Sequence, residues 1–183
     1  MKDRTKYIFA EKIQQMAKKH PIRSIQVKEL CEECHMDRTA FYYHFRDKYD
    51  LVAWIFERYY RDAAEKVESI NNEEMICMML YHMRENRAFF LDALQDHNQN
   101  NLRQYMLDFY ITFEKEILCR YLNTDSLSEE MEYMIKQYSF GCMGHTIDWL
   151  LGKNDLTPEK MAKYQYKFMP EVLKQAMKTR YNR

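Results

Sequence analysis

The chain has 183 residues, with 28 basic and 28 acidic side chains and a hydrophobic content of 46%, values typical of a soluble globular protein of one or two domains. Only three glycines and three prolines are available for tight turns, so an all-α fold is expected. No uncharged apolar run reaches the about 18 residues of a membrane span, and no secretory signal begins the chain. Five cysteines, scattered apart from one pair, indicate reduced thiols and a cytoplasmic location.

The charge is distributed unevenly along the chain. Residues 1–48 contain 11 basic and 7 acidic side chains, a net charge of +4. The rest contains 17 basic and 21 acidic side chains, a net charge of −4. A basic segment joined to an acidic body indicates an anionic partner for the N-terminal part.

Four helices are predicted in the N-terminal part. Residues 4–19 have apolar side chains at helical spacing, and His20-Pro21 should end that helix. A short helix is expected over Val27–Glu33, and the next should start after Asp37, a good N-cap residue, and end near Phe45. The fourth helix should span about residues 48–68.

The remaining sequence is rich in methionine and aromatic residues and predicts five longer helices. We place them at about 73–84, 87–95, 100–122, 128–152 and 158–179. Ser126 and Glu129 have the spacing of a capping box before the fourth of these. Thr157 followed by Pro158 is typical of an N-cap with proline at the first helical position. Pro170 should kink the last helix.

Cys31 and Cys34, in the stretch "CEECH", could hold zinc, form a redox dithiol or pack as small apolar residues. A structural zinc site needs four ligands, and the other cysteines stand alone. A thioredoxin-like motif needs a βαβ setting, and no strand pattern flanks this one. We therefore favour core packing and predict no metal site, while a thiol-responsive or metal-responsive sensor remains an alternative.

The same region has the pattern of a helix-turn-helix unit. "VKELCEE" would be the first helix, "CHM" the turn, with His35 at a left-handed position, and "DRTAFYYHF" the second helix, which lies in the DNA major groove in such units. Arg38 and Thr39 would reach base edges, and Phe41 and Phe45 would anchor the helix on the core. The predicted DNA-binding residues are Lys28, Arg38, Thr39, Ala40, Tyr42, Tyr43, His44 and Lys48.

The stretch "VKELCEECHMDRTAFYYHFRDKYDLV" resembles the DNA-binding segment of TetR-family regulators, and the resemblance covers residues 4–55. It implies that Tyr42 and Lys48 bind phosphates while Arg38, Thr39, Tyr43 and His44 face the groove. The chain departs from the family pattern where Gln26 replaces a Ser or Thr cap, His35 the glycine of the turn and Thr39 a frequent glycine. Cys31 and Cys34 stand where alanine is common.

The resemblance implies a helix-turn-helix domain over residues 1–50, followed over residues 51–183 by a helical domain that dimerises and encloses an effector. The last two predicted helices are apolar on more than one face, which favours a homodimer. Candidate interface residues are Gly141, Gly144, Trp149, Tyr164, Phe168 and Val172. Candidates for a pocket for a small apolar effector are Met79, His82, Met83, Phe89, Phe90, Tyr105, Phe109, Phe113, Tyr138, Cys142 and His145, although ordinary core packing explains the same pattern.

We therefore expect a homodimeric transcription regulator, a repressor, that binds a near-palindromic operator in double-stranded DNA. The segment "MRENRAFFLDALQDHNQNNL" also resembles the branch of the family that includes the DhaS-type regulators of dihydroxyacetone metabolism, which act with a protein partner. A DNA-bound coregulator controlled by another protein is therefore an alternative. No motif of an enzyme is present, and we predict no catalytic residues and no cofactor.

Overall fold

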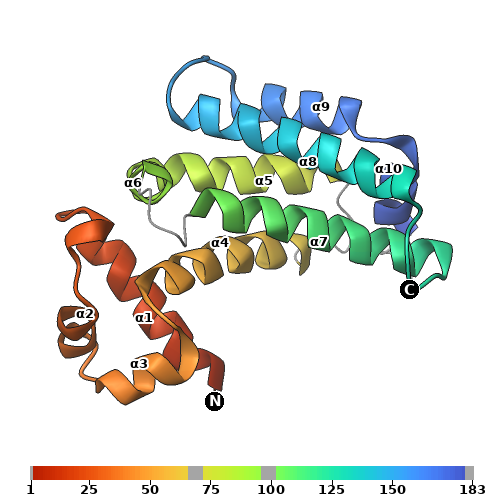
Figure 1. Ribbon diagram of the computed structural model, residues 1–183. Helices are drawn as coiled ribbons and strands as arrows, with labels where there is room; N and C mark the ends of the chain where they lie inside the picture. Colours follow the sequence, from red (N-terminus) through yellow and green to blue (C-terminus); the bar gives the residue numbers. More distant parts are fainter. Residues whose placement is uncertain (1, 66–71, 96–101, 180–183) are drawn as a thin grey trace. The chain divides into compact units, whose positions relative to one another are not determined.

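The computed structural model describes residues 2–65, 72–95 and 102–179, and within these ranges it contains helices and no strand (Figure 1). In chain order the elements are α1 (Lys2–Ala17), the 3₁₀ helix η1 (Ile22–Ser24), α2 (Val27–Glu33), α3 (Arg38–His44), α4 (Lys48–Glu65), α5 (Asn72–Glu85), α6 (Arg87–Gln95), α7 (Leu102–Leu122), α8 (Glu129–Leu150), α9 (Pro158–Phe168) and α10 (Glu171–Thr179). The predicted all-α fold is confirmed. The predicted helix residues 66–68 and 100–101 lie outside the described ranges.

The chain divides into two compact units. The first contains residues 1–58 and 86–105, and the second contains residues 59–85 and 106–183. Each of the two long helices α4 and α7 therefore contributes residues to both units. Within the described residues, no helix is both long and apolar enough to cross a membrane.

Aromatic side chains form the core of the first unit. Phe9 of α1, Phe41 of α3 and Phe45, which follows α3, are each at most 2% exposed. The ring centroids of Phe9 and Phe41 lie 5.2 Å apart in an edge-to-face arrangement, and those of Phe41 and Phe45 lie 5.7 Å apart. Such pairs add to the free energy gained by burying the rings. The predicted anchoring role of Phe41 and Phe45 is confirmed, and it fixes which face of α3 points outward.

The turn between α2 and α3 contains the left-handed residue that the sequence predicted. His35 has a positive φ of 53°, which histidine tolerates better than most residues. His35 N donates to Glu32 O at 3.1 Å and Met36 N to Cys31 O at 3.0 Å, the two hydrogen bonds of a Schellman motif. They satisfy carbonyl groups that the end of α2 would otherwise leave unpaired.

The predicted capping box of Ser126 and Glu129 is wrong. The N-cap residue of α8 is Ser128, whose Oγ accepts a hydrogen bond of 3.3 Å from Met131 N. Ser126 instead belongs to the preceding turn, where its carbonyl accepts a hydrogen bond of 2.9 Å from Thr124 Oγ1. The turn therefore engages Ser126 before the helix begins.

Pro170 has a stronger effect than the predicted kink, because it separates α9 from α10. Met169, the residue before it, is extended with φ −62° and ψ 135°, since the proline ring disfavours a helical conformation there. Lys174 Nζ donates to Lys167 O at 3.1 Å and so covers the carboxyl end of α9. At the other end of α9, the predicted cap is confirmed: Thr157 Oγ1 accepts a hydrogen bond of 3.4 Å from Lys160 N, and Pro158 opens the helix.

The second unit is built around α5, which packs against α8, α9 and α10. Its aromatic core is centred on Tyr60, whose ring centroid lies 5.1 Å from that of Phe109, 5.6 Å from that of Tyr110 and 4.9 Å from that of Phe113. Methionine side chains of α5, among them Met79 and Met83, are also buried. Because methionine is flexible, this core can adapt its shape.

Candidate DNA-binding surface and ligand cavity

The outward face of α3 gathers four polar or aromatic side chains. Arg38, Thr39, Tyr42 and Tyr43 line one open hollow on the surface of the first unit. Tyr42 is 48% exposed and Tyr43 is 66% exposed. Asp37 Oδ1 caps the helix by accepting a hydrogen bond of 2.7 Å from Ala40 N. Arg38 and Thr39 are therefore the first two residues of the helix. A short helix with its N-terminal side chains exposed has the arrangement needed to reach base edges.

Side chains on this face contact one another. Arg38 Nη2 donates to Tyr42 Oη at 3.4 Å, and the guanidinium carbon lies 5.6 Å from the centre of the Tyr42 ring. The rings of Tyr43 and His44 meet edge to face with centroids 4.9 Å apart. The contact with Tyr42 limits the conformations of the exposed Arg38 side chain.

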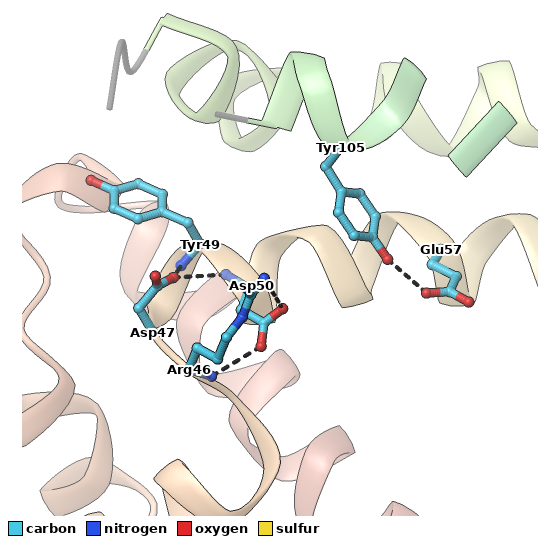
Figure 2. Close-up of polar contacts among 6 residues, drawn as sticks. All are labelled: Arg46, Asp47, Tyr49, Asp50, Glu57 and Tyr105. Carbon is cyan, nitrogen blue, oxygen red and sulfur yellow. Dashed lines mark hydrogen bonds and ion pairs between the residues drawn. The ribbon is translucent and has the colours of Figure 1, made fainter. Parts of the chain in front are cut away.

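Lys48 connects the start of α4 to the segment between α1 and α2. Its Nζ donates to Arg23 O at 2.7 Å and to Ile25 O at 2.8 Å. Figure 2 shows the polar contacts that fix the first turn of α4. Asp47 Oδ1 accepts hydrogen bonds of 2.8 Å and 2.9 Å from the backbone nitrogens of Tyr49 and Asp50. The ammonium group of Lys48 is therefore held at a defined place beside η1.

The other predicted DNA-binding residues lie on α2 and α3. Lys28 of α2 is exposed and forms a 3.8 Å ion pair with Glu32 one turn along the helix. Ala40 and His44 of α3 are partly exposed. The pattern of exposure thus matches a surface on which α3 supplies most contacts and α2 one cation.

Cys31 and Cys34 are buried on the inner side of α2. Burial raises the pKa of both thiols, that of Cys34 to about 11, so both remain protonated and poorly nucleophilic at neutral pH. Among the described residues, no group of three possible metal ligands is found. The two cysteines pack as small apolar residues.

The second unit contains a cavity of about 40 Å³. It is lined by Tyr60, Met75, Ile76, Met79, Leu80, Met83, Tyr110, Glu114, Tyr138, Cys142, Thr146, Gln165, Met169 and Met177. Glu114 is only 4% exposed, and its Oε2 accepts a hydrogen bond of 3.0 Å from Ser139 Oγ. Burial raises the pKa of Glu114 to about 8, although the Ser139 hydrogen bond opposes the increase. The carboxyl group is therefore mainly protonated at neutral pH.

A larger groove of about 630 Å³ lies between α8 and α9. It is lined by Tyr133, Met134, Gln137, Tyr138, Gly141, Cys142, His145, Asn154, Leu156, Met161, Tyr164, Gln165, Phe168 and Pro170. Phe168 is 72% exposed and Tyr164 is 46% exposed. A Cβ atom added at Gly141 or Gly144 would meet no atom within 4 Å from outside its own helix turn. Neither glycine is therefore required for close packing within the described chain.

Comparison with known families identifies the chain. Residues 14–55 match the family described as "Bacterial regulatory proteins, tetR family", and residues 71–171 match a "Transcriptional regulator C-terminal region" of the same group. The second match covers more than half of the 183 residues. The chain belongs to the TetR family of transcriptional regulators. The α2–turn–α3 unit is accordingly its helix-turn-helix.

A solved structure has a similar fold. It is titled "Dihydroxyacetone kinase operon activator DhaS", and it matches with a TM-score of 0.62 and 17% sequence identity over 93% of this chain and 95% of that one. At 17% sequence identity this similarity shows a shared fold and nothing more. A comparison with curated protein sequences finds no match.

The effector-pocket residues expected from the sequence do not all come together in this TetR-family regulator. Met79, Met83, Tyr138 and Cys142 line the cavity, whereas His145 lines the groove. His82 lies against the ring of Tyr59. The other five are divided between the units: Phe109 and Phe113 pack around Tyr60 in the second, while Phe89, Phe90 and Tyr105 belong to the first.

Glu114 was missed from the sequence, although a signal for it exists. It lies on α7 four residues after Tyr110 and three before Ile117, both on a mainly apolar stripe. A charged side chain within an apolar stripe is unusual, because charged residues are normally exposed. The structure shows that Glu114 is buried and that Ser139 of α8 donates a hydrogen bond to it.

The predicted interface residues also differ from one another in exposure. Val172 is partly exposed. Trp149 is 8% exposed, and its Nε1 donates to Leu156 O at 2.7 Å.

Proposed function

We propose that this protein is a homodimeric transcription regulator that binds a near-palindromic operator. In this proposal residues 1–50 form the DNA-binding domain and residues 51–183 the effector and dimerisation domain. The observation that carries it is the outward face of α3, where Arg38, Thr39, Tyr42 and Tyr43 are exposed above the buried anchors Phe41 and Phe45. Arg38 and Thr39 would contact bases, and the tyrosine hydroxyls would contact phosphates or bases.

The mode of regulation that we propose is repression, because a dimer that covers an operator blocks transcription without a further contact to the polymerase. In this proposal the protein acts in the cytoplasm, where the operators of bacterial regulatory proteins lie. A promoter carrying the selected operator and fused to a reporter tests the sign. Expression that falls when the regulator is supplied supports repression, and expression that rises contradicts it.

We place the dimer interface on the exposed face of α8 and α9. Tyr133, Phe140 and Phe168 are 70%, 55% and 72% exposed there, and large apolar side chains gathered on one face favour a protein contact. Gly141 and Gly144 on the same helix would allow a second helix to approach closely. Sedimentation tests this proposal. A dimer supports it, whereas a monomer at micromolar concentration would contradict it and favour the coregulator alternative.

The experiment that tests DNA recognition is a selection of bound fragments from randomised duplex DNA, with enough salt to suppress nonspecific phosphate binding. Two α3 helices on one dimer should enrich a near-palindrome whose half-sites lie about 34–36 Å, or one helical turn, apart. An absence of any enriched sequence with folded, dimeric protein would contradict the proposal.

A further inference from the structure

Glu114 is a buried carboxyl group that has no cationic partner among the residues that the structure describes. Among the described residues it is the one charged side chain that is buried. In the described part of the chain, no lysine, arginine or histidine lines the cavity that Glu114 also lines. A carboxylate removed from water requires a compensating charge or must take up a proton. At neutral pH the Glu114 carboxyl group meets this requirement with a proton, and a cation bound in the cavity would take the place of that proton.

We infer that this cavity binds a small organic cation, a protonated primary amine with a short alkyl chain, with Glu114 as its counter-ion. This inference rests on the proposed function, which assigns residues 51–183 to an effector and dimerisation domain, and it adds the chemical class of that effector. The ammonium group would pair with the carboxylate, and Ser139 Oγ, 3.0 Å from Oε2, would hold the carboxylate in place.

The aromatic walls of the cavity also favour a cation. Tyr60 from α4, Tyr110 from α7 and Tyr138 from α8 all line it. The rings of Tyr60 and Tyr110 meet edge to face with centroids 5.6 Å apart. The faces of aromatic rings attract ammonium groups, most strongly where water is excluded. A neutral alcohol of the same shape would lose both this attraction and the ion pair.

The volume sets the size of the ligand. A cavity of about 40 Å³ holds roughly three water molecules, so only a compact ligand fits without rearrangement. Five methionines line it: Met75, Met79, Met83, Met169 and Met177. Their flexible side chains can move to admit a few methylene groups, which favours a short alkyl chain over a bulky or rigid one.

The wall between the cavity and the α8–α9 groove provides a route for the ligand. Tyr138, Cys142 and Gln165 line both spaces. Tyr138 Oη donates to Gln165 O at 3.1 Å, and Gln165 Nε2 donates to Thr146 Oγ1 at 3.1 Å. The residues shared by the two linings thus lie between the cavity and the surface groove, and in this proposal a ligand would pass by displacing their side chains.

Binding of an ammonium group should release a proton. The titratable groups that face Glu114 are Tyr60 of α4, Tyr110 of α7, and Tyr138 and Cys142 of α8, whereas the cavity residues of α5, α9 and α10 do not titrate. Burial raises the pKa values of Tyr110 and Tyr138, and it raises that of Cys142 to about 12. Glu114, with a pKa of about 8, is then the group that ionises when the cation arrives.

The test is isothermal titration calorimetry of the full-length protein with n-propylammonium chloride and, separately, propan-1-ol. We expect the ammonium ion to bind on the order of tenfold or more tightly than the alcohol. Glu114→Gln, which keeps the shape but cannot ionise, should remove this preference. Glu116→Gln, an exposed change on the same helix, should leave it intact. Equal affinity for the two probes, or ammonium binding that survives Glu114→Gln, overturns the inference.

A second readout needs no variant, so it holds even if Glu114→Gln fails to fold. Titrations at about pH 6.5 in buffers of different ionisation enthalpy should show release of about one proton per bound ammonium ion. No proton release overturns the inference. Because these titrations contain no DNA, their failure is separate from failure of the operator selection.

Discussion

The hydroxyl group of Tyr105 donates a hydrogen bond of 2.7 Å to Glu57 Oε2, which joins α7 to α4 within the first unit (Figure 2). Removing this hydroxyl leaves a partly buried carboxylate without that donor. Tyr105→Phe should therefore lower the free energy of unfolding by about 1–2 kcal/mol in urea denaturation. Tyr43→Phe, at a ring that is 66% exposed and lies outside the proposed dimer interface, is the control and should change it little. Equal stability of the Tyr105 variant and the parent protein would contradict the importance of this bond.

Replacing Arg38 tests the assignment of the reading face. Arg38→Ala should weaken binding to the selected operator by about 1–3 kcal/mol and relax the preference at particular base pairs. Repeating the DNA selection with the variant measures both effects. An unchanged ranking of sequences would show that another side chain reads the bases.

Lys48→Ala should act differently, because the lysine donates hydrogen bonds to backbone carbonyls and, as the family resemblance implies, also binds a DNA phosphate. We expect weaker binding to all sequences and a salt dependence reduced by about one phosphate contact. Loss of the hydrogen bonds to Arg23 O and Ile25 O should also lower stability by about 1–3 kcal/mol. Lys153→Ala, in the second unit, should leave DNA affinity unchanged. A stability loss with normal DNA binding would restrict Lys48 to a structural role.

The raised pKa of Glu114 predicts the pH dependence of stability. Between the ordinary carboxyl value of 4.5 and about 8, the folded protein keeps a proton that the unfolded chain has released. Glu114 therefore contributes stability that is fully present below pH 4.5 and is lost as the pH rises through about 8. The slope is at most about 1.4 kcal/mol per pH unit. Urea denaturation at several pH values should show this slope in the parent and in Glu116→Gln but not in Glu114→Gln.

A larger side chain at Gly144 should separate folding from dimerisation. Because a Cβ atom there meets nothing within 4 Å, Gly144→Gln leaves the subunit unstrained and improves helix propensity by about 0.5–1 kcal/mol. At the proposed interface the same side chain would block close approach of a second helix. Sedimentation should show a folded monomer, while the exposed change Asp125→Asn should leave a dimer. A dimer of unchanged affinity would move the interface elsewhere.

The parts of the fold that local sequence determines were predictable. The bounds of α2, the left-handed His35 and the Thr157–Pro158 start of α9 all depend on residues within a few positions of each other. Even local rules fail where two signals compete: Ser126 has the capping-box spacing, but Ser128 caps α8. The spacing pattern does not include the hydrogen bond from Thr124 that holds Ser126 in the turn.

Contacts between distant segments account for what sequence reasoning missed. Glu114 of α7 accepts a hydrogen bond from Ser139 of α8. Lys48 donates to carbonyl groups more than twenty residues earlier in the chain. Neither pairing leaves a periodic trace in the sequence. Methionine and phenylalanine at helical spacing predict burial well, but they do not say whether a side chain lines a cavity or fills the core. This is why only part of the predicted pocket came together.

The layer formed by Tyr138, Cys142 and Gln165 between cavity and groove has an evolutionary consequence. A substitution at any of these three positions changes the wall of the buried cavity and the surface of the groove at once. If the cavity selects the ligand and the groove receives the second subunit, ligand preference and subunit pairing cannot diverge independently at these positions. A paralogue that acquires a new ligand by substitutions at these positions would also lose the ability to form mixed dimers with the parent protein. The two regulators would then control their genes independently of each other.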